Sequence, residues 1–403
     1  MPDYLPTDVV YNIVSFFPND RATLRACSHV CWTFKDPSQE LLFSCITLTN
    51  LRITQLRNIS SSPRLSAHVR TIAFTSPDWG LSLDTIRELL SKLPNIRTLM
   101  FSLGSRITYF MPVLIELQPQ MKVEHIENES CKGLPLKLLR IYPHLRRLAL
   151  PDADIVGLTE AVLSLQASPA ARHDTVLPQT QSSPRPKLQV LTGRDYMVRT
   201  GEKPLSHYLF PWLSHSSSSL DISELQHFDW QCHNSRDWNI LLNFMLSLSH
   251  TLRSLVLHID SGTLHFAAET RHISLATFSR LRFLDFRLAF GTGRDRVIQL
   301  QNFVFQITST LPKSNHLEII EITIQLHPLC PDSIHQDAWE SLDSLLSQTR
   351  FAHLVEVQIH LTLEHAVRTQ KLLDFVGRAT QSLFACFCQM GERGKIRIFG
   401  DVD

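Results

Sequence analysis

The 403-residue sequence lacks an excess of charge of either sign, since 39 lysines and arginines stand against 38 aspartates and glutamates. Without a global field, the composition does not point toward nucleic acid or a membrane surface as a partner. The sequence also lacks an apolar stretch of the roughly 18 residues that a membrane span needs, and its first residues contain no basic patch followed by an apolar run. We therefore expect a soluble protein in the cytoplasm, the nucleus or both.

Framework cysteines and catalytic motifs are also lacking. The eight cysteines are scattered, as is typical of reduced thiols inside a cell. No Gly-x-x-x-x-Gly-Lys phosphate loop and no Gly-x-Ser-x-Gly nucleophile elbow is present. One loose group of potential metal ligands lacks the paired spacing of a zinc site: His327, Cys330, His335, Cys386 and Cys388. We expect no cofactor, no metal and no catalytic residue; a divergent enzyme whose pocket is hidden from the sequence is a less favoured alternative.

The first 48 residues contain a compact apolar pattern. Pro6 fits the first turn of a helix, where its missing N–H would be unpaired in any case. Behind it, apolar residues recur at intervals of three and four, which predicts one stripe along a helix and its burial. This stripe consists of Val9, Val10, Ile13, Phe16 and Phe17. A core this small is marginal alone, so the segment should pack on something else.

Two more helices are predicted in this segment. Asp20 can cap a second helix that runs to Val30. The pair Asp36-Pro37 is predicted to interrupt the helical pattern. A third apolar segment extends from Gln39 to Ile46. Three short helices followed by a short strand, Cys45–Leu48, complete the predicted N-terminal module of residues 1–48.

The order and spacing of several residues in this module resemble the F-box family, in particular its fungal form. These residues are Leu5-Pro6, Ile13, Leu24, Val30-Cys31 and Leu42-Phe43. Phe34 and Phe43 depart from the family pattern, which commonly has tryptophan at both places. The resemblance implies a module that docks on the adaptor Skp1 and, through it, joins a cullin-based ubiquitin ligase.

By this resemblance, nine residues are expected to bind Skp1: Leu5, Pro6, Val10, Ile13, Leu24, Val30, Phe34, Leu42 and Phe43. Of these, Leu5, Pro6 and Ile13, together with Leu24, should be exposed when the module is alone, because an interface patch on so small a unit faces solvent until the partner covers it. The alternative is an ordinary helical hairpin that caps the next domain.

From residue 49 onward the sequence repeats the six-residue pattern apolar-x-x-apolar-x-apolar. The copies begin 22 to 43 residues apart, which brackets the usual unit of one strand and one helix. Helix-like stripes such as 83–93 and 339–346 lie between the copies, and caps such as Ser82 precede them. The copies begin at Val69, Ile96, Val123, Leu145, Leu188, Leu225, Leu252, Leu281, Leu317 and Leu354. A last helix at 369–388 and an edge strand at 395–399 are predicted at the C-terminal end.

A strand, a helix and a parallel strand in repetition predict an α/β fold with a curved, mostly parallel sheet. Residues 49–403 resemble the leucine-rich repeat domains attached to many F-box proteins, although the asparagine ladder of regular repeats is missing. Residues 168–186, rich in serine, proline and glutamine, are predicted to be a disordered insert. The combined resemblance implies a substrate adaptor that performs no bond chemistry; a repeat scaffold outside any ligase is the alternative.

The pattern also predicts which strand side chains face away from the core. Side chains alternate along a strand, so the fourth and sixth positions should face the core and the third and fifth the open sheet face. In the C-terminal copies the outward positions form a candidate target-binding face of Asp229, Phe283, Asp285, Glu321 and Glu356. We interpret these as unpaired acids around an exposed aromatic ring, which suits a basic, partly apolar segment. The alternative is a solvated face whose acids are neutralised by Arg253 and Arg282.

Overall fold

The computed structural model describes residues 5–18, 20–48, 53–75, 82–102, 107–129, 133–151, 155–166, 185–195, 204–216, 218–231, 235–260, 274–289, 294–326, 336–363 and 370–401. The chain divides into two compact units, Met1–Lys187 and Leu188–Asp403. Both units are mixed α/β, and the strand pairings are parallel. The predicted α/β class with a large, mostly parallel sheet is therefore confirmed. Most of the predicted insert, 168–184, lies outside the described residues.

The first unit contains three N-terminal helices and then alternating strands and helices. Its main sheet has the strand order β1-β2-β3-β4-β6, and β5 pairs with β7. The strands are β1 (Cys45–Leu48), β2 (Thr71–Phe74), β3 (Thr98–Phe101), β4 (His125–Asn128), β5 (Leu134–Pro135), β6 (Arg147–Pro151) and β7 (Ile155–Val156). The helices are α1 (Thr7–Ser15), α2 (Arg21–Val30), α3 (Trp32–Ser44), α4 (Ile53–Ser61), α5 (Pro63–Ser66), α6 (Leu83–Ser91), α7 (Ile107–Leu117), the 3-10 turn η2 (Gln118–Gln120), α8 (Leu136–Ile141) and α9 (Leu158–Gln166).

The second unit continues the alternation with longer strands, in the order β8-β9-β10-β11-β12-β13-β14. The strands are β8 (Val190–Arg194), β9 (His227–Gln231), β10 (Ser254–Asp260), β11 (Phe283–Ala289), β12 (Ile319–Leu326), β13 (Glu356–Leu363) and β14 (Ile396–Asp401). The helices are α10 (Ser206–Ser214), α11 (Ser235–Ser247), α13 (Arg294–Ser309), α14 (Gln336–Leu346), the 3-10 turn η3 (Thr349–Phe351), α15 (Gln370–Cys386) and α16 (Cys388–Glu392). The helix predicted at 369–388 and the strand predicted at 395–399 are thus confirmed as α15 and β14.

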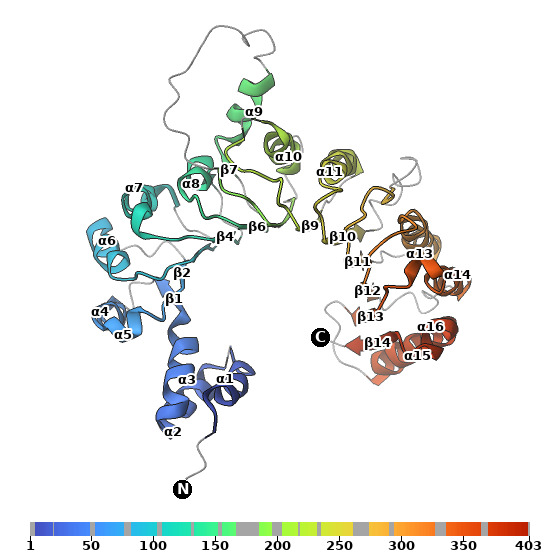
Figure 1. Ribbon diagram of the computed structural model, residues 1–403, viewed down its shortest axis with the longest axis horizontal. Helices are drawn as coiled ribbons and strands as arrows, with labels where there is room; N and C mark the ends of the chain where they lie inside the picture. Colours follow the sequence, from blue (N-terminus) through green and yellow to red (C-terminus); the bar gives the residue numbers. More distant parts are fainter. Residues whose placement is uncertain are drawn as a thin grey trace. The chain divides into compact units, whose positions relative to one another are not determined.

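Each copy of the six-residue pattern places a strand at its third position. The ladders align equivalent positions, so that Asp229 pairs with Val256, Val256 with Asp285, and Asp285 with Glu321. The fourth and sixth positions face the core as predicted; Leu284 and Phe286, for example, are completely buried. In the second unit the helices lie on one side of the sheet (Figure 1). The opposite side, which no described helix covers, is called the open face below.

One glycine makes room for a large core side chain in the second unit. Gly193 of β8 pairs with Trp230 of β9, and a Cβ atom at Gly193 would lie 2.5 Å from Cζ3 of the Trp230 ring. Trp230 is only 1% exposed, and its ring packs edge-on against Phe210 of α10. A side chain at position 193 would therefore displace the largest ring at this end of the core.

The three N-terminal helices differ from prediction in two respects. Helix α1 begins after Pro6 and α2 is capped by Asp20, whose carboxylate accepts hydrogen bonds from Ala22 N and Thr23 N, both as predicted. The predicted interruption at Asp36-Pro37 is wrong, because Pro37 lies inside a continuous α3. The chain turns instead at Cys31, which has an extended backbone, and losing one internal hydrogen bond at Pro37 does not end the helix.

The predicted burial of the whole α1 stripe is also wrong. The core of the three helices consists of Val10, Val14, Leu24 and Leu42, with Phe34, Leu41 and Phe43 packed against it. Val9, Ile13, Phe16 and Phe17 remain exposed. The four buried side chains of this core cover only one side of α1, so the neighbouring apolar side of the helix faces outward.

Candidate functional site

The first candidate site is the outward side of α1. Val9 and Ile13 lie one turn apart on α1, Phe16 and Phe17 follow directly after its last residue, Ser15, and Leu5 precedes the helix. Phe16 is 79% exposed and Leu5 is 48% exposed. We call these five residues the α1 patch. Of the sixteen large apolar side chains that are exposed in the described part of the chain, eight lie between Leu5 and Trp32.

The residues predicted to bind Skp1 fall into three groups in the structure. Leu5, Pro6, Ile13 and Val30 are exposed, as a contact surface requires. Phe34 and Phe43 are half-buried against the small core. The remaining three are buried: Val10, Leu24 and Leu42.

The expected exposure of Leu24 is wrong, since this side chain is only 1% exposed. Val10 and Leu42 pack beside it, so these three residues hold the helices together and present no surface to a partner. Sequence periodicity does not separate the two roles, because a core leucine and an interface leucine occupy the same kind of position on a helix.

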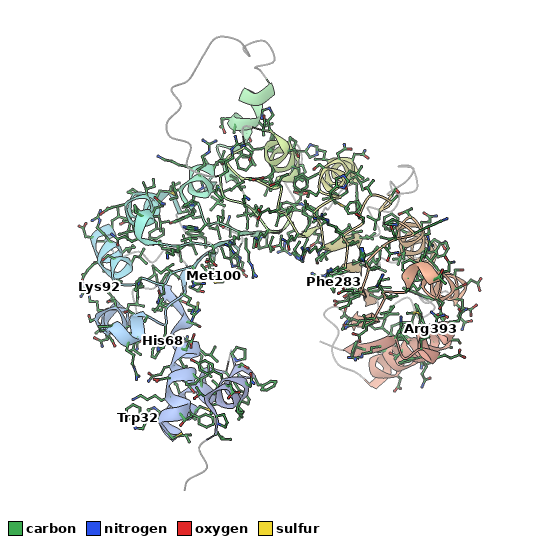
Figure 2. All side chains as sticks on the ribbon, viewed as in Figure 1. Trp32, His68, Lys92, Met100, Phe283 and Arg393 are labelled. Carbon is green, nitrogen blue, oxygen red and sulfur yellow. The ribbon has the colours of Figure 1, made fainter. Side chains whose placement is uncertain are left out.

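Sequence reasoning missed the two most exposed aromatic residues of the module. Phe16 was assigned to the buried stripe and not to an interface, and Trp32 was not considered. Trp32 is 75% exposed and projects from the start of α3 (Figure 2). A signal for Phe16 was present. If the helical pattern is continued to Phe16 at about 100° per residue, the apolar residues span an arc of about 160°, with Phe16 at one edge and Val14 at the other. An apolar stripe that faces a core is upward of about 100° wide, and this arc is wider than the four buried side chains cover.

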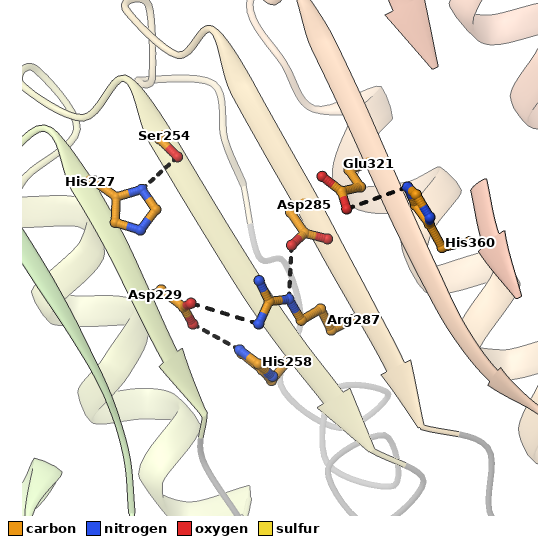
Figure 3. A network of polar contacts seen from close by, with 8 residues as sticks. All are labelled: His227, Asp229, Ser254, His258, Asp285, Arg287, Glu321 and His360. Atoms are coloured by element: carbon orange, nitrogen blue, oxygen red, sulfur yellow. Dashed lines mark hydrogen bonds and ion pairs between the residues drawn. The ribbon is translucent and has the colours of Figure 1, made fainter. Parts of the chain in front are cut away.

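The second candidate site is the open face of the second unit, where the predicted acids stand in one row. None of these acids is unpaired (Figure 3). The Asp229 carboxylate accepts a hydrogen bond from His258 Nε2 at 2.8 Å if that nitrogen carries the proton, and Arg287 Nη1 lies 3.8 Å away. Arg287 Nε donates to Asp285 Oδ2 at 2.9 Å. The guanidinium of Arg287 therefore bridges two acids that stand two strands apart.

The other two acids of the row are paired as well. Glu321 lies 3.6 Å from His360 Nε2, and Glu356 lies 2.6 Å from Arg397 Nε. The prediction of unpaired acids is wrong because strand residues beyond the six-residue pattern supply the cations. Arg282, which was considered as a neutralising group, instead pairs with Glu318 at 3.3 Å.

Two further expectations for this face are corrected. Phe283 is half-buried and not the exposed ring that was expected. Asp285 is almost completely buried, and burial raises its pKa to about 6, an effect that the Arg287 charge opposes. Its second carboxylate oxygen, Oδ1, has no hydrogen-bond partner among the described residues. The acid row is therefore an internal network and offers little free negative charge to a basic ligand.

The open face is hollowed next to this row. The hollow is lined by residues at positions seven to nine of strands β9 to β13, counted from the start of each six-residue pattern. Its polar side chains hold positions seven and nine: His258 and Arg287 hold position seven, and Thr323 and Gln325 hold positions seven and nine of β12. These residues were missed because the pattern ends at position six. The alternation of polar and apolar residues continues past it, as in Thr323-Ile324-Gln325-Leu326, and this was the signal.

Two pairs on β9 and β10 have the residue types of a hydrolase but not its arrangement. Ser254 Oγ lies 2.7 Å from His227 Nδ1, whereas the Asp229 carboxylate bonds to His258. A catalytic triad needs one histidine between the hydroxyl and the carboxylate. The contacts therefore favour a structural role for both pairs.

Metal and membrane sites are not found in the described residues. No group of three or more histidine, cysteine, aspartate or glutamate residues there is placed to hold a metal ion. His327, Cys330 and His335 lie outside the described residues. Among the described helices, none has the length and apolar character that crossing a membrane requires.

Comparison with known proteins adds no relative: no protein-family model matches the chain, and no curated protein matches it. The functional conclusion therefore depends on the α1 patch and on the open face of the second unit.

Proposed function

We propose that this protein is a substrate-recognition adaptor of a Skp1-cullin-F-box ubiquitin ligase. In this proposal the helices α1 to α3 form an F-box that docks on a Skp1-like adaptor. The strand-helix units after them form an irregular, leucine-rich-repeat-like solenoid, and its second unit holds a protein target. The chain itself performs no bond chemistry and contributes proximity, because it raises the effective concentration of a target lysine near the charged partner.

The observation that carries the proposal is the α1 patch. Exposed apolar residues scattered singly over a surface are ordinary, but a stripe on one short helix is typical of a protein interface. The stripe adjoins a core of only four buried side chains, so the module gains by leaning on a partner. The order of Leu5-Pro6, Ile13, Val30 and Leu42-Phe43 in the sequence fits the F-box resemblance at the same place.

The test measures Skp1 binding by the purified full chain. A Leu5→Ser, Phe16→Ser double variant should bind Skp1 at least about tenfold more weakly, because each buried anchor of an interface contributes about 1 to 2 kcal/mol or more. Both side chains are exposed, so the variant should retain the unfolding temperature of the wild type.

The matched control is Leu246→Ser on α11 of the second unit, where the side chain is 47% exposed. This control should bind Skp1 like the wild type. Equal Skp1 affinity of the double variant and the control, or no Skp1 binding by the wild type, would contradict the proposal. In the second case a repeat scaffold outside any ligase, which uses the open face alone, becomes the better description.

A further inference from the structure

The second unit has a half-open hollow at the carboxyl ends of strands β9 to β13. Its volume is about 250 Å³. The polar side chains that line it are Gln231, His258, Arg287, Thr323, Gln325 and Thr362. All six are at least partly accessible, and Arg287 is 46% exposed.

The side chains that line the hollow include a basic group but no acidic group. They contain a guanidinium, an imidazole, two hydroxyls and two amides, and no carboxylate. The guanidinium is a permanent cation with five N–H donors, and the hydroxyls and amides can both donate and accept hydrogen bonds. The imidazole of His258 faces Asp229 through Nε2, so in its neutral form it offers no further donor. The donors of the hollow therefore come from Arg287 and from the hydroxyl and amide groups.

The acids that the sequence placed on this face stand behind the lining. Asp229 contacts both His258 and Arg287, and Asp285 accepts from Arg287 Nε (Figure 3). The side chain of Asp229 is 19% exposed and that of Asp285 is 2% exposed, whereas Arg287 faces solvent with nearly half of its surface. Two carboxylates thus fix the direction of the guanidinium and the imidazole, as carboxylates orient histidine ligands behind metal ions.

These ion pairs use only part of the Arg287 guanidinium. Nε is used by Asp285, and Nη1 faces Asp229 at 3.8 Å. Even with these two ion pairs, the Arg287 side chain is 46% exposed. A guanidinium whose inner edge is held and whose outer donors face a hollow is suited to an oxygen anion, because its donors match the spacing of carboxylate and phosphate oxygens.

We propose that this hollow binds an oxygen anion on a peptide segment of the target, either a carboxylate or a phosphate, with Arg287 as its principal contact. The proposal rests on the proposed function, in that it names the target chemistry of the second unit. It reverses the sign of the ligand expected from the sequence, since Asp229 and Asp285 are paired with Arg287 and the exposed charged group of the hollow is the guanidinium.

The experiment uses the full chain and three simple probes at constant ionic strength: inorganic phosphate, acetate and butylammonium. Binding of a probe to the folded state raises the unfolding temperature, because it stabilises that state by RT ln(1 + [L]/Kd), where [L] is the free probe concentration. Phosphate or acetate should raise it and butylammonium should not. Phosphate alone would identify a phosphorylated segment, and acetate an acidic residue or a free chain end.

Arg287→Gln should weaken the anion affinity by about tenfold or more, because a charge-assisted hydrogen bond is lost. The matched control is Arg282→Gln on the same strand segment, whose side chain is 58% exposed and pairs with Glu318 outside the hollow. General stabilisation by phosphate salts acts on both variants alike, so their difference isolates the site. Because the chain is measured alone, the result does not depend on Skp1 binding.

A second variant covers the case in which Arg287→Gln does not fold. Thr323→Val keeps the shape of the side chain and removes one hydroxyl from the residue that pairs with Arg287 on β12, so it should weaken anion binding by about fivefold. Stabilisation by butylammonium in place of the anions would overturn the proposal. Anion affinities that are equal in the wild type and in every folded variant of the hollow would overturn it as well.

Discussion

The strands of the two units begin at the same position of the six-residue pattern but end at different positions. In the first unit, β2, β3 and β4 stop at position six of the pattern, whereas β10 to β13 of the second unit continue for another three or four residues. The core residues are the same in kind: Ile72 and Phe74 of β2 are as deeply buried as Leu284 and Phe286 of β11. The difference lies outside the core.

The extra residues of the second unit hold its network and its hollow. His258, Arg287, Thr323 and His360 all occupy position seven, which the short strands of the first unit lack. The first unit instead presents an apolar surface on helix α1. The comparison teaches that burial patterns specify the shared core, while each unit acquires its own binding chemistry from residues that the core does not need.

The strongest test of this division is the small core beneath the α1 patch. Leu24→Ala should lower the free energy of unfolding of α1 to α3 by about 2 to 5 kcal/mol, the range for removing a buried leucine side chain. Ile13→Ala, at a position that is 38% exposed, should change it by less than about 1 kcal/mol and weaken Skp1 binding instead. Hydrogen exchange measured by mass spectrometry reports on helices α1 and α2 separately from the second unit. Similar exchange in both variants would mean that core and interface are not divided in this way.

The next largest effect is expected in the network of the second unit. Burial raises the pKa of Asp285 to about 6 in the folded protein, against about 3.9 in an unfolded chain. Between these values the folded state binds more protons than the unfolded state. The contribution of Asp285 to stability therefore falls as pH rises from about 4 to about 6, by at most about 3 kcal/mol.

Asp285→Asn should remove this fall, which urea unfolding at several pH values can measure as a difference from the wild type. Glu318→Gln, an acid with a 44% exposed side chain just before β12, is the control and should retain the wild-type dependence. A wild-type curve that does not differ from the Asp285→Asn curve between about pH 4 and pH 6 would show that Asp285 is not held in this buried state.

The smallest effect concerns the shared core at β8. Gly193→Ala should destabilise the second unit by about 1 to 3 kcal/mol, because the added methyl group overlaps the Trp230 ring. Gly377→Ala in α15 is the matched control, since nothing lies within 4 Å of its Cβ position. This control should be neutral or stabilising by up to about 1 kcal/mol through helix propensity. Thermal unfolding followed by tryptophan fluorescence compares the two, and equal melting temperatures would show that the core accommodates a side chain at position 193.

The strands were predictable because two periodicities coincide in them. The alternation of Leu284 and Phe286 with polar neighbours fixes both the strand and its face, and the same register recurs in each copy. Helices such as α6 were predictable from a stripe and a cap, and Ser82 does accept a hydrogen bond from Thr85 N. Local signals were sufficient wherever one face only is buried.

The candidate site was less predictable, since it depends on partners that are distant in sequence. The sequence placed Asp229 and Asp285 on one face correctly, but the cation that joins them comes from position seven of β11 and reaches across β10. At α1, the periodicity detected the apolar residues and could not tell Val10, which meets Leu42, from Phe16, which meets solvent. Which face of an apolar helix is covered is decided by the size of the core, and a single helix does not contain that information.

The passage from α3 into β1 has a mechanical consequence. Helix α3 ends at Ser44 and β1 begins at Cys45, so no linker residue separates them. Arg70 at the start of the next repeat contacts Glu40 at 2.6 Å, and Arg64 of α5 contacts Asp36 at 3.2 Å. The helices α1 to α3 are therefore joined to the sheet of the first unit by a continuous backbone and two ion pairs, and not by a flexible linker. A partner that docks on α1, as proposed, would have its orientation toward β1 set by this junction.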